Sequence, residues 1–265
     1  MNFLKQLLAK RNGYFIRPGY TPRTQPEYYW VAPDAQRGRV YQPCVYPLAV
    51  VLARRAGCTT LIDIGSGNAE KLVRAHPEFH LIGMDFGANL DHCRRHYPFG
   101  EWVEWNIDRH PAPPLPRRVL AESLLVCSDV IEHLASPDRL LLALNKWLKV
   151  APCAILSTPD RDLVRGPEDP GPPANSAHVR EWNLAELHRL LRHFGLIADY
   201  ISYTLNNSVS REKKTILAVL RRKTLRHRTA PLPPGAPAVA TLLEILNENE
   251  ELASEGFGEG VGPII

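Results

Sequence analysis

Acidic and glycine residues follow two short apolar segments of this chain in an arrangement that suits a ligand site. The segment LIDIGSGNAEKL places Asp63 at the end of an apolar run and Gly65 and Gly67 in the turn after it. Glycines let the backbone turn sharply and come close to a ligand, because no Cβ stands in the way. The next apolar run, HLIGMD, ends in Asp85, where a carboxylate can accept hydrogen bonds from both hydroxyls of a ribose. The pattern predicts a site for a ligand that contains a nucleoside.

Two later apolar runs bring further polar groups to the same region. The run in EWVEWNIDRH leads to Asn106 and Ile107, and we expect the Asn106 side chain and the Ile107 backbone to contact an adenine. The run in SLLVCSDVIEHL is followed by four polar residues: Ser128, Asp129, Glu132 and His133. Ligands bind at the carboxyl edge of open α/β sheets, so we expect the four run ends to form one site.

A long segment rich in proline and glycine, residues 157–187, has the composition of an active-site lid or binding loop. It carries His178, which no helical pattern explains. Asn183 and Glu186 are spaced as the capping box of a following helix, and Trp182 before them is a hydrophobic anchor. We expect His133 and His178 to converge on an acceptor hydroxyl. An imidazole with a pKa near neutrality can take a proton from such a group.

Alternating strand and helix patterns predict the scaffold that positions these residues. The predicted strands cover residues 60–64, 80–85, 101–105, 123–128, 152–157, 198–205 and 214–221. A helix is predicted over 45–56, another is expected to start at Ala69, and a third covers 183–194. Such alternation is typical of a largely parallel α/β sheet with helices on both faces, and the last two strands should form an antiparallel pair at one edge.

The chain divides into three parts by pattern. Residues 1–44 form a short helix and an irregular segment, 45–223 the α/β domain, and 224–265 a Pro-rich linker and acidic tail with a helix over 240–252. With 265 residues, 45% apolar content and a net charge of +4, one catalytic domain is expected, and no apolar run is long enough to span a membrane. The five cysteines lack a CxxC pair, which indicates reduced, buried thiols. We expect a cytoplasmic protein without a membrane partner.

The motifs together resemble the class I S-adenosylmethionine-dependent methyltransferases. The resemblance spans residues 45–222 and rests on these segments: DIGSGNA at 63–69, Asp85, NID at 106–108, SDVIEHL at 128–134 and LSTPD at 156–160. It implies a Rossmann-like seven-stranded sheet of order 3-2-1-4-5-7-6 with strand 7 antiparallel. It also implies that S-adenosylmethionine is the cofactor, bound by Asp63, Gly65, Gly67, Asp85, Asn106, Ile107 and Ser128. Ala69 and Asn106 depart from the family pattern, which more often has Gly and Asp there.

The lid sequence GPPAN..HVREW resembles bacterial methyltransferases associated with sugar or natural-product assembly. This implies O-methylation of a glycosyl or other small hydroxylated acceptor, with Asp129, His133 and His178 as the catalytic residues. The D-x-x-E-H motif and His178 are also similar to small-RNA 2′-O-methyltransferases and, in part, to ubiquinone-pathway O-methyltransferases. In that alternative a divalent metal, held by Asp129, Glu132, His133 and His178, activates a ribose or vicinal hydroxyl.

Other functions remain as alternatives. A dinucleotide-dependent dehydrogenase is disfavoured because Glu70 stands where a third glycine would face a pyrophosphate. Nucleic acid is disfavoured as acceptor because the lysine and arginine residues between 211 and 228 flank an apolar strand and form no continuous basic surface. An inactive methyltransferase-like module that binds a protein partner stays open, and an oligomer is compatible with the sequence.

Overall fold

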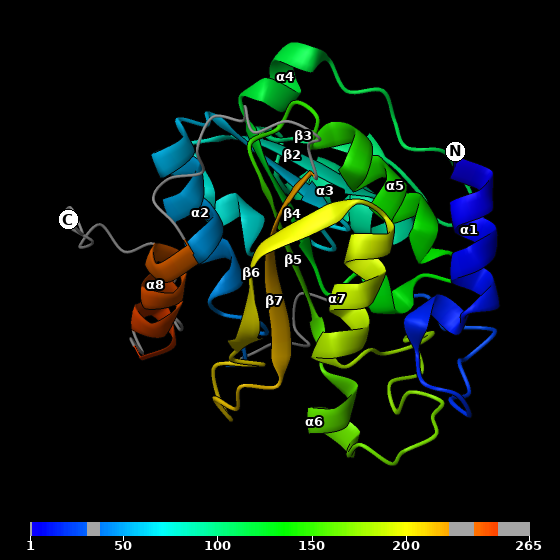
Figure 1. Ribbon diagram of the computed structural model, residues 1–265. Coiled ribbons are helices and arrows are strands. Elements are labelled where there is room, and N and C mark those ends of the chain that lie inside the picture. The colour runs from blue at the N-terminus through cyan, green and yellow to red at the C-terminus, as the bar shows by residue number, and fades with distance from the viewer. Residues whose placement is uncertain (1, 31–37, 223–235, 249–265) are drawn as a thin grey trace.

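The computed structural model describes residues 2–30, 38–222 and 236–248. The predicted sheet order, β3-β2-β1-β4-β5-β7-β6, is confirmed (Figure 1). The strands are β1 (Thr60–Ile64), β2 (His80–Asp85), β3 (Glu101–Glu104), β4 (Ser123–Ser128), β5 (Ala154–Pro159), β6 (Leu196–Thr204) and β7 (Thr215–Arg222). The first five pair in parallel, and β7 runs antiparallel to both β5 and β6. The carboxyl ends of β1 to β5 therefore meet at one edge.

Helices cover both faces of this sheet because its central strands are apolar on both sides. The α-helices are α1 (Asn2–Arg11), α2 (Val45–Ala56), α3 (Gly87–His96), α4 (Arg117–Ala121), α5 (Pro137–Trp147), α6 (Arg161–Arg165), α7 (Leu184–His193) and α8 (Ala236–Glu248). Short 3-10 helices are η1 (Gly13–Phe15), η3 (Leu72–Ala75) and η4 (Ile131–His133). Alternate residues of β1 enter two cores: Ile62 packs with α5 and α7, and Leu61 with α2 and α8.

Several boundaries differ from the sequence expectations, for tertiary reasons. The helix expected to start at Ala69 is wrong: Ala69 has φ +59°, and turns lead into η3. Strand β5 continues to Pro159 because that residue still pairs with Thr215. The last helix begins at Ala236 and not at residue 240, and residues 249–252 lie outside the described part of the chain.

The segments flanking the α/β unit also pack against it. Tyr14 in η1 donates a hydrogen bond to buried Asp138 over 3.0 Å, and its carbonyl accepts one from Trp182 over 3.0 Å. On the other face, Leu242, Leu243 and Leu246 of α8 are buried in the core that α2 covers. All five cysteines are buried and free, as expected. None of the described helices is both long and apolar enough to cross a bilayer.

Candidate active site

A pocket of about 570 Å³ lies at the carboxyl edge of the sheet. The predicted site residues that line it follow four strands: Gly65, Gly67, Asp85, Asn106, Ile107, Ser128, Asp129, Glu132 and His133, with His178 from the lid. A pocket of this size suits a cofactor or small ligand. The structure therefore brings together all of the sequence-predicted site residues except Asp63.

Asp85 ends β2 with its carboxylate held in place by the neighbouring backbone. One oxygen accepts a hydrogen bond from the amide of Gly67 over 2.8 Å. The other accepts from the amide of Phe86 over 2.7 Å and from Asn89 Nδ2 over 3.2 Å. Burial raises the pKa of this carboxyl, while these hydrogen bonds lower it. The carboxylate is thus oriented before any ligand binds.

The glycine turn after β1 is built for close approach. Gly65 has φ +73°, and a Cβ there would lie 2.4 Å from Val130 Cγ2, so no other residue fits without displacing the segment after β4. The backbone amides of this turn are already bonded. The amides of Gly65 and Ser66 both donate to the carbonyl of Met84, and Gly67 donates to Asp85.

The third strand end supplies the wall next to this turn. Asn106 Oδ1 accepts a hydrogen bond from the amide of Arg109 over 3.2 Å, so this oxygen already closes a turn. Asp108 accepts hydrogen bonds from the amides of Ala135 and Ser136 over 3.0 and 2.8 Å. These bonds connect the segment after β3 to the segment after β4 and fix the shape of the pocket between them.

Asp63 lies behind the pocket and not in its lining. It is fully buried and accepts a hydrogen bond from Tyr46 Oη over 2.7 Å. Burial raises its pKa to about 7, against the lowering effects of Tyr46 and Lys71. Tyr46 does line the pocket, so Asp63 contacts the site through that phenol.

Lys71 and Tyr46 are pocket residues that the sequence reasoning missed. The Lys71 Nζ atom lies 5.2 Å from the centre of the Tyr46 ring. Burial lowers the pKa of Lys71, whereas the charges of Asp129 and Asp63 raise it. Lys71 belongs to the quoted glycine motif, but no local pattern shows that its side chain reaches the pocket. The site therefore holds a cation beside two buried carboxyl groups.

Asp129 follows β4 in a strained backbone conformation, with φ +54°. Its Oδ1 atom is buried and has no hydrogen-bond partner among the described residues. Burial raises its pKa to about 6, while Lys71, His178 and Gln42 lower it. Ser128 next to it is paired with Ser157, with the two Oγ atoms 2.9 Å apart.

The two predicted histidines converge, as expected. The ring centroids of His133, in η4, and His178, in the lid, are 4.7 Å apart with the rings nearly perpendicular. His133 Nδ1 donates to the carbonyl of Ala177 over 3.0 Å, which leaves Nε2 as a hydrogen-bond acceptor. The expected pKa near neutrality is wrong for His133, because burial and, to a smaller extent, the neighbouring His178 lower its pKa to about 3.

His178 has partners on both ring nitrogens. Nδ1 lies 2.7 Å from Glu181 Oε1, and Nε2 lies 3.0 Å from Asn175 Nδ2. Asn175 Oδ1 accepts from the amide of Ala177, so its Nδ2 is the group that faces His178. This network assigns the proton of His178 to Nδ1 and leaves the Nε2 lone pair occupied by Asn175.

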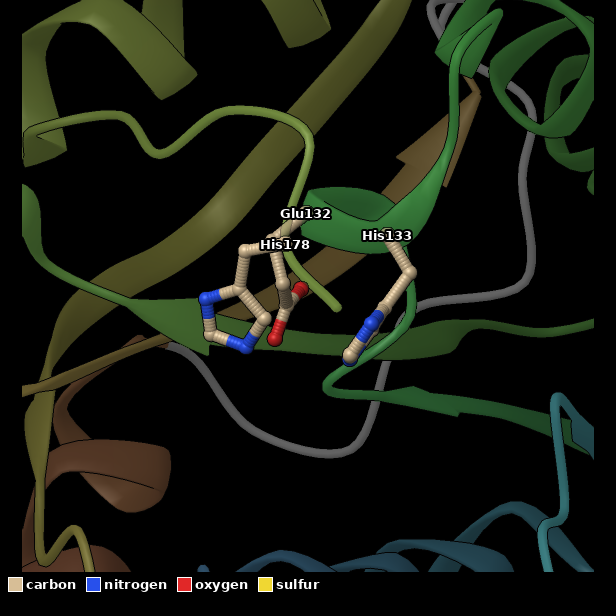
Figure 2. Close-up of side chains that lie close together, drawn as sticks. All are labelled: Glu132, His133 and His178. Carbon is tan, nitrogen blue, oxygen red and sulfur yellow. The ribbon is translucent and has the colours of Figure 1, made fainter. Parts of the chain in front are cut away.

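Figure 2 shows Glu132 next to both imidazole rings. One ligand atom from each of Glu132, His133 and His178 lies within 4.8 Å of the others, whereas Asp129 is outside this group. Glu132 Oε2 accepts from Thr158 Oγ1 over 2.8 Å, and its buried Oε1 has no hydrogen-bond partner within the described ranges. Burial and the charge of Asp129 raise the pKa of Glu132 well above its ordinary value.

Ion pairs hold the lid that carries His178. Buried Arg161 binds Glu186 over 2.7 and 3.1 Å, and Arg165 binds Glu181 over 2.9 Å. The capping box of Asn183 and Glu186 is confirmed. Arg161 and Arg165 thus fix the lid, and neither lines the pocket.

The N-terminal segment closes one side of the pocket. Tyr28 Oη donates to the carbonyl of Phe86 over 3.0 Å, and the carbonyl of Tyr29 accepts from Asn89 over 3.1 Å. The Tyr29 ring lies 5.1 Å from the ring of His133, and both tyrosines line the pocket. The part of the chain expected to precede the domain therefore contributes to its site.

Comparisons with known proteins give a fold and not a family. No family model and no curated protein matches the chain. Among solved structures, a chain of the complex between the Haloferax volcanii Trm112 methyltransferase activator and the putative methyltransferase is similar. It has a TM-score of 0.51 and 14% identity over 70% of this chain and 92% of that chain.

S-adenosylmethionine-dependent methyltransferases from two bacteria are similar in the same way. The Mesorhizobium loti structure has a TM-score of 0.50 and 15% identity over 66% of this chain and 96% of its own. The Clostridium acetobutylicum structure has a TM-score of 0.50 and 11% identity over 70% of this chain and 93% of its own. The chain therefore has the Rossmann-like fold of S-adenosylmethionine-dependent methyltransferases.

Proposed function

We propose that this protein is an S-adenosylmethionine-dependent methyltransferase that methylates a hydroxyl of a sugar or another small acceptor. One observation carries the proposal. One pocket at the carboxyl edge contains a pre-oriented acidic strand end, a turn in which Gly65 has no room for a Cβ, and a neutral imidazole whose Nε2 has no hydrogen-bond partner among the described residues. The first two features suit a nucleoside, and the third suits an acceptor hydroxyl.

The charges in the pocket complement the methyl donor. S-adenosylmethionine supplies an electrophilic methyl group on a sulfonium, and it also carries a ribose diol and an amino-acid end. The Asp85 carboxylate would bind the diol, and the backbone at Asn106 and Ile107 would contact the adenine. The unpartnered Asp129 Oδ1 would bind the ammonium, and Lys71 the carboxylate.

His133 is the base in this proposal. The acceptor oxygen bonds to the methyl carbon as the sulfur–carbon bond breaks, and His133 Nε2 takes the hydroxyl proton. A pKa of about 3 keeps His133 neutral at physiological pH, so its lone pair is always available. A weak base suffices because the hydroxyl becomes strongly acidic as its oxygen is alkylated. His178, bonded on both nitrogens, positions His133 through ring contact.

Isothermal titration with S-adenosylmethionine and a methylation assay test the proposal together. We expect donor binding by the purified protein and, with isotopically labelled donor and a cell extract, a labelled small hydroxylated product by mass spectrometry. Absence of binding heat would instead favour an inactive partner-binding module. Labelled RNA or protein in place of a small molecule would refute the acceptor class.

A second candidate, metal-assisted methylation of a ribose or vicinal diol, is favoured by the cluster of Glu132, His133 and His178. Two of the three donors fit a divalent ion as they stand: among the described residues, Glu132 Oε1 is buried without a partner and His133 Nε2 accepts no hydrogen bond. His178 Nε2 would have to exchange its contact with Asn175 for the ion. The other polar atoms, His133 Nδ1, His178 Nδ1 and Glu132 Oε2, are held by Ala177, Glu181 and Thr158, as outer-shell partners hold metal ligands. Two imidazoles and one carboxylate suit manganese, iron, cobalt or zinc better than calcium.

Chelation separates the two candidates. If His133 acts as a base, activity should survive EDTA. If the cluster binds an ion, EDTA should abolish activity, and one added divalent metal should restore it.

A further inference from the structure

Helix α1 presents its apolar side chains to solvent. Phe3, Leu4, Leu7 and Leu8 have exposed fractions of 77, 63, 53 and 39%. On the opposite side of the same helix, Ala9 is fully buried, and Lys5 and Gln6 are half-buried. A surface helix of a globular protein normally packs its apolar side against the core and turns its polar side outward. The arrangement in α1 is the reverse.

Contacts at both ends of the segment fix this orientation. The carbonyl of Lys5 accepts a hydrogen bond from His193 Nε2 of α7 over 3.2 Å. After the helix, the buried Tyr14 bonds to Asp138 of α5 and to Trp182. Figure 1 shows α1 beside α5 and α7 on one side of the molecule, and α1 contacts both helices. The outward apolar stripe is therefore set by tertiary packing.

The exposed charges on α1 and on the two helices that it contacts are positive. The exposed charged side chains of α1, α5 and α7 are Lys10, Arg11, Arg139, Lys146, Arg189 and Arg192. The acids on these helices, Asp138 and Glu186, are buried and bonded to Tyr14 and Arg161. Within the described residues of the three helices, every exposed charge is thus positive.

We propose that this face docks on the surface of an anionic lipid bilayer, with the apolar stripe inserted among the acyl chains nearest the headgroups. Phenylalanine and leucine exposed on one side of a helix, with lysine and arginine exposed on the same helix and on its neighbours, are the chemistry of an interfacial helix. The positive charges complement anionic headgroups. A second copy of this chain is a worse occupant, because two α1 helices would bring like charges together across the contact. That none of the described helices could cross a bilayer does not bear on binding of this kind.

Vesicle binding tests this proposal independently of methyl transfer. The full chain is titrated with phosphatidylcholine vesicles that contain or lack phosphatidylglycerol, at low and at high salt. We expect binding to the anionic vesicles that weakens as salt rises. Phe3→Ser with Leu7→Ser should weaken it at least about tenfold, and so should Lys10→Glu with Arg11→Glu.

Matched variants control for general effects of polarity and charge. Leu163→Ser with Val209→Ser changes two exposed apolar residues elsewhere, and Arg55→Glu with Arg95→Glu reverses two exposed charges on α2 and α3. Both should bind vesicles as the wild type does, and all four variants should keep the wild-type melting temperature within a few degrees. Absence of vesicle binding by the wild type would overturn the proposal, as would equal losses in the control variants. A wild-type dimer that Phe3→Ser with Leu7→Ser dissociates would assign the face to a second copy instead.

Discussion

Replacing Asp85 with Asn is the sharpest test of the donor site. The substitution keeps the size of the side chain and removes its charge. Asp85 is buried at the end of β2, and both of its oxygens already accept hydrogen bonds from Gly67, Phe86 and Asn89. Asn offers one acceptor oxygen where Asp offers two, so one of these hydrogen bonds is lost together with the charge, and the effect on ligand affinity reports on the missing charge and the missing acceptor.

The expected loss of donor affinity follows from two hydrogen bonds to the ribose. One hydrogen bond to a charged group contributes about 1.5 to 3 kcal/mol, and an amide can still accept one of the two. We expect a total loss of about 2 to 4 kcal/mol, which raises Kd about 30- to 1000-fold. The unfolding free energy should change less, because two effects oppose each other. The variant loses a hydrogen bond from the backbone amide of Gly67 or Phe86, but it no longer buries a carboxylate whose pKa is raised by burial.

Isothermal titration with S-adenosylmethionine measures Kd, and thermal unfolding without ligand reports on the fold. Asp91→Asn is the matched control, because it removes the same charge from an exposed position on α3. It should leave Kd unchanged. If Asp85→Asn binds the donor as tightly as the wild type while its melting temperature is also unchanged, Asp85 does not bind the ribose and the donor pose is wrong.

Three further outcomes are expected. His133→Gln should lower kcat about 100-fold. In the wild type, kcat should show no titration of His133 between about pH 6 and 9, because the pKa of His133 is about 3. A kcat that rises through a pKa near 6.5 would contradict this assignment. In the folded state Asp63 has a pKa of about 7, above its unfolded value of 3.8. Between these pH values the folded state therefore binds a proton that the unfolded state has released. The contribution of Asp63 to stability then falls as pH rises from about 4 to 7. This trend should lower the unfolding free energy by at most about 4 kcal/mol between about pH 4 and pH 7, as measured by urea unfolding at both pH values. Asp63→Asn should remove the trend. Deleting residues 231–265 should lower the unfolding free energy by about 5 kcal/mol, because three buried leucines of α8 are lost. Donor affinity should be kept, because none of the pocket-lining residues belongs to α8.

Local sequence patterns were sufficient for the scaffold and for the positions of the strand ends. Short apolar runs that end in Asp85, Ser128 or a glycine turn place those residues at one edge, because parallel strands share a direction. The capping box at Asn183 was equally readable, since its two partners are three residues apart. The helix expected at Ala69 failed because the turn amides bond to Met84 and Asp85, neighbours from the adjacent strand.

The chemical state of the site was decided by tertiary structure. The sequence places His133 beside a strand end, but only burial against the lid lowers its pKa to about 3. Nothing local shows that Lys71 and Tyr46 enter the pocket, that Asp63 lies behind it, or that Arg161 is buried against Glu186. The apolar composition of α1 is visible in the sequence, whereas its outward orientation follows from contacts with α5 and α7. Strand and turn patterns depend on a few adjacent residues, while pKa values, ion pairs and exposure depend on groups that folding brings together from distant parts of the chain.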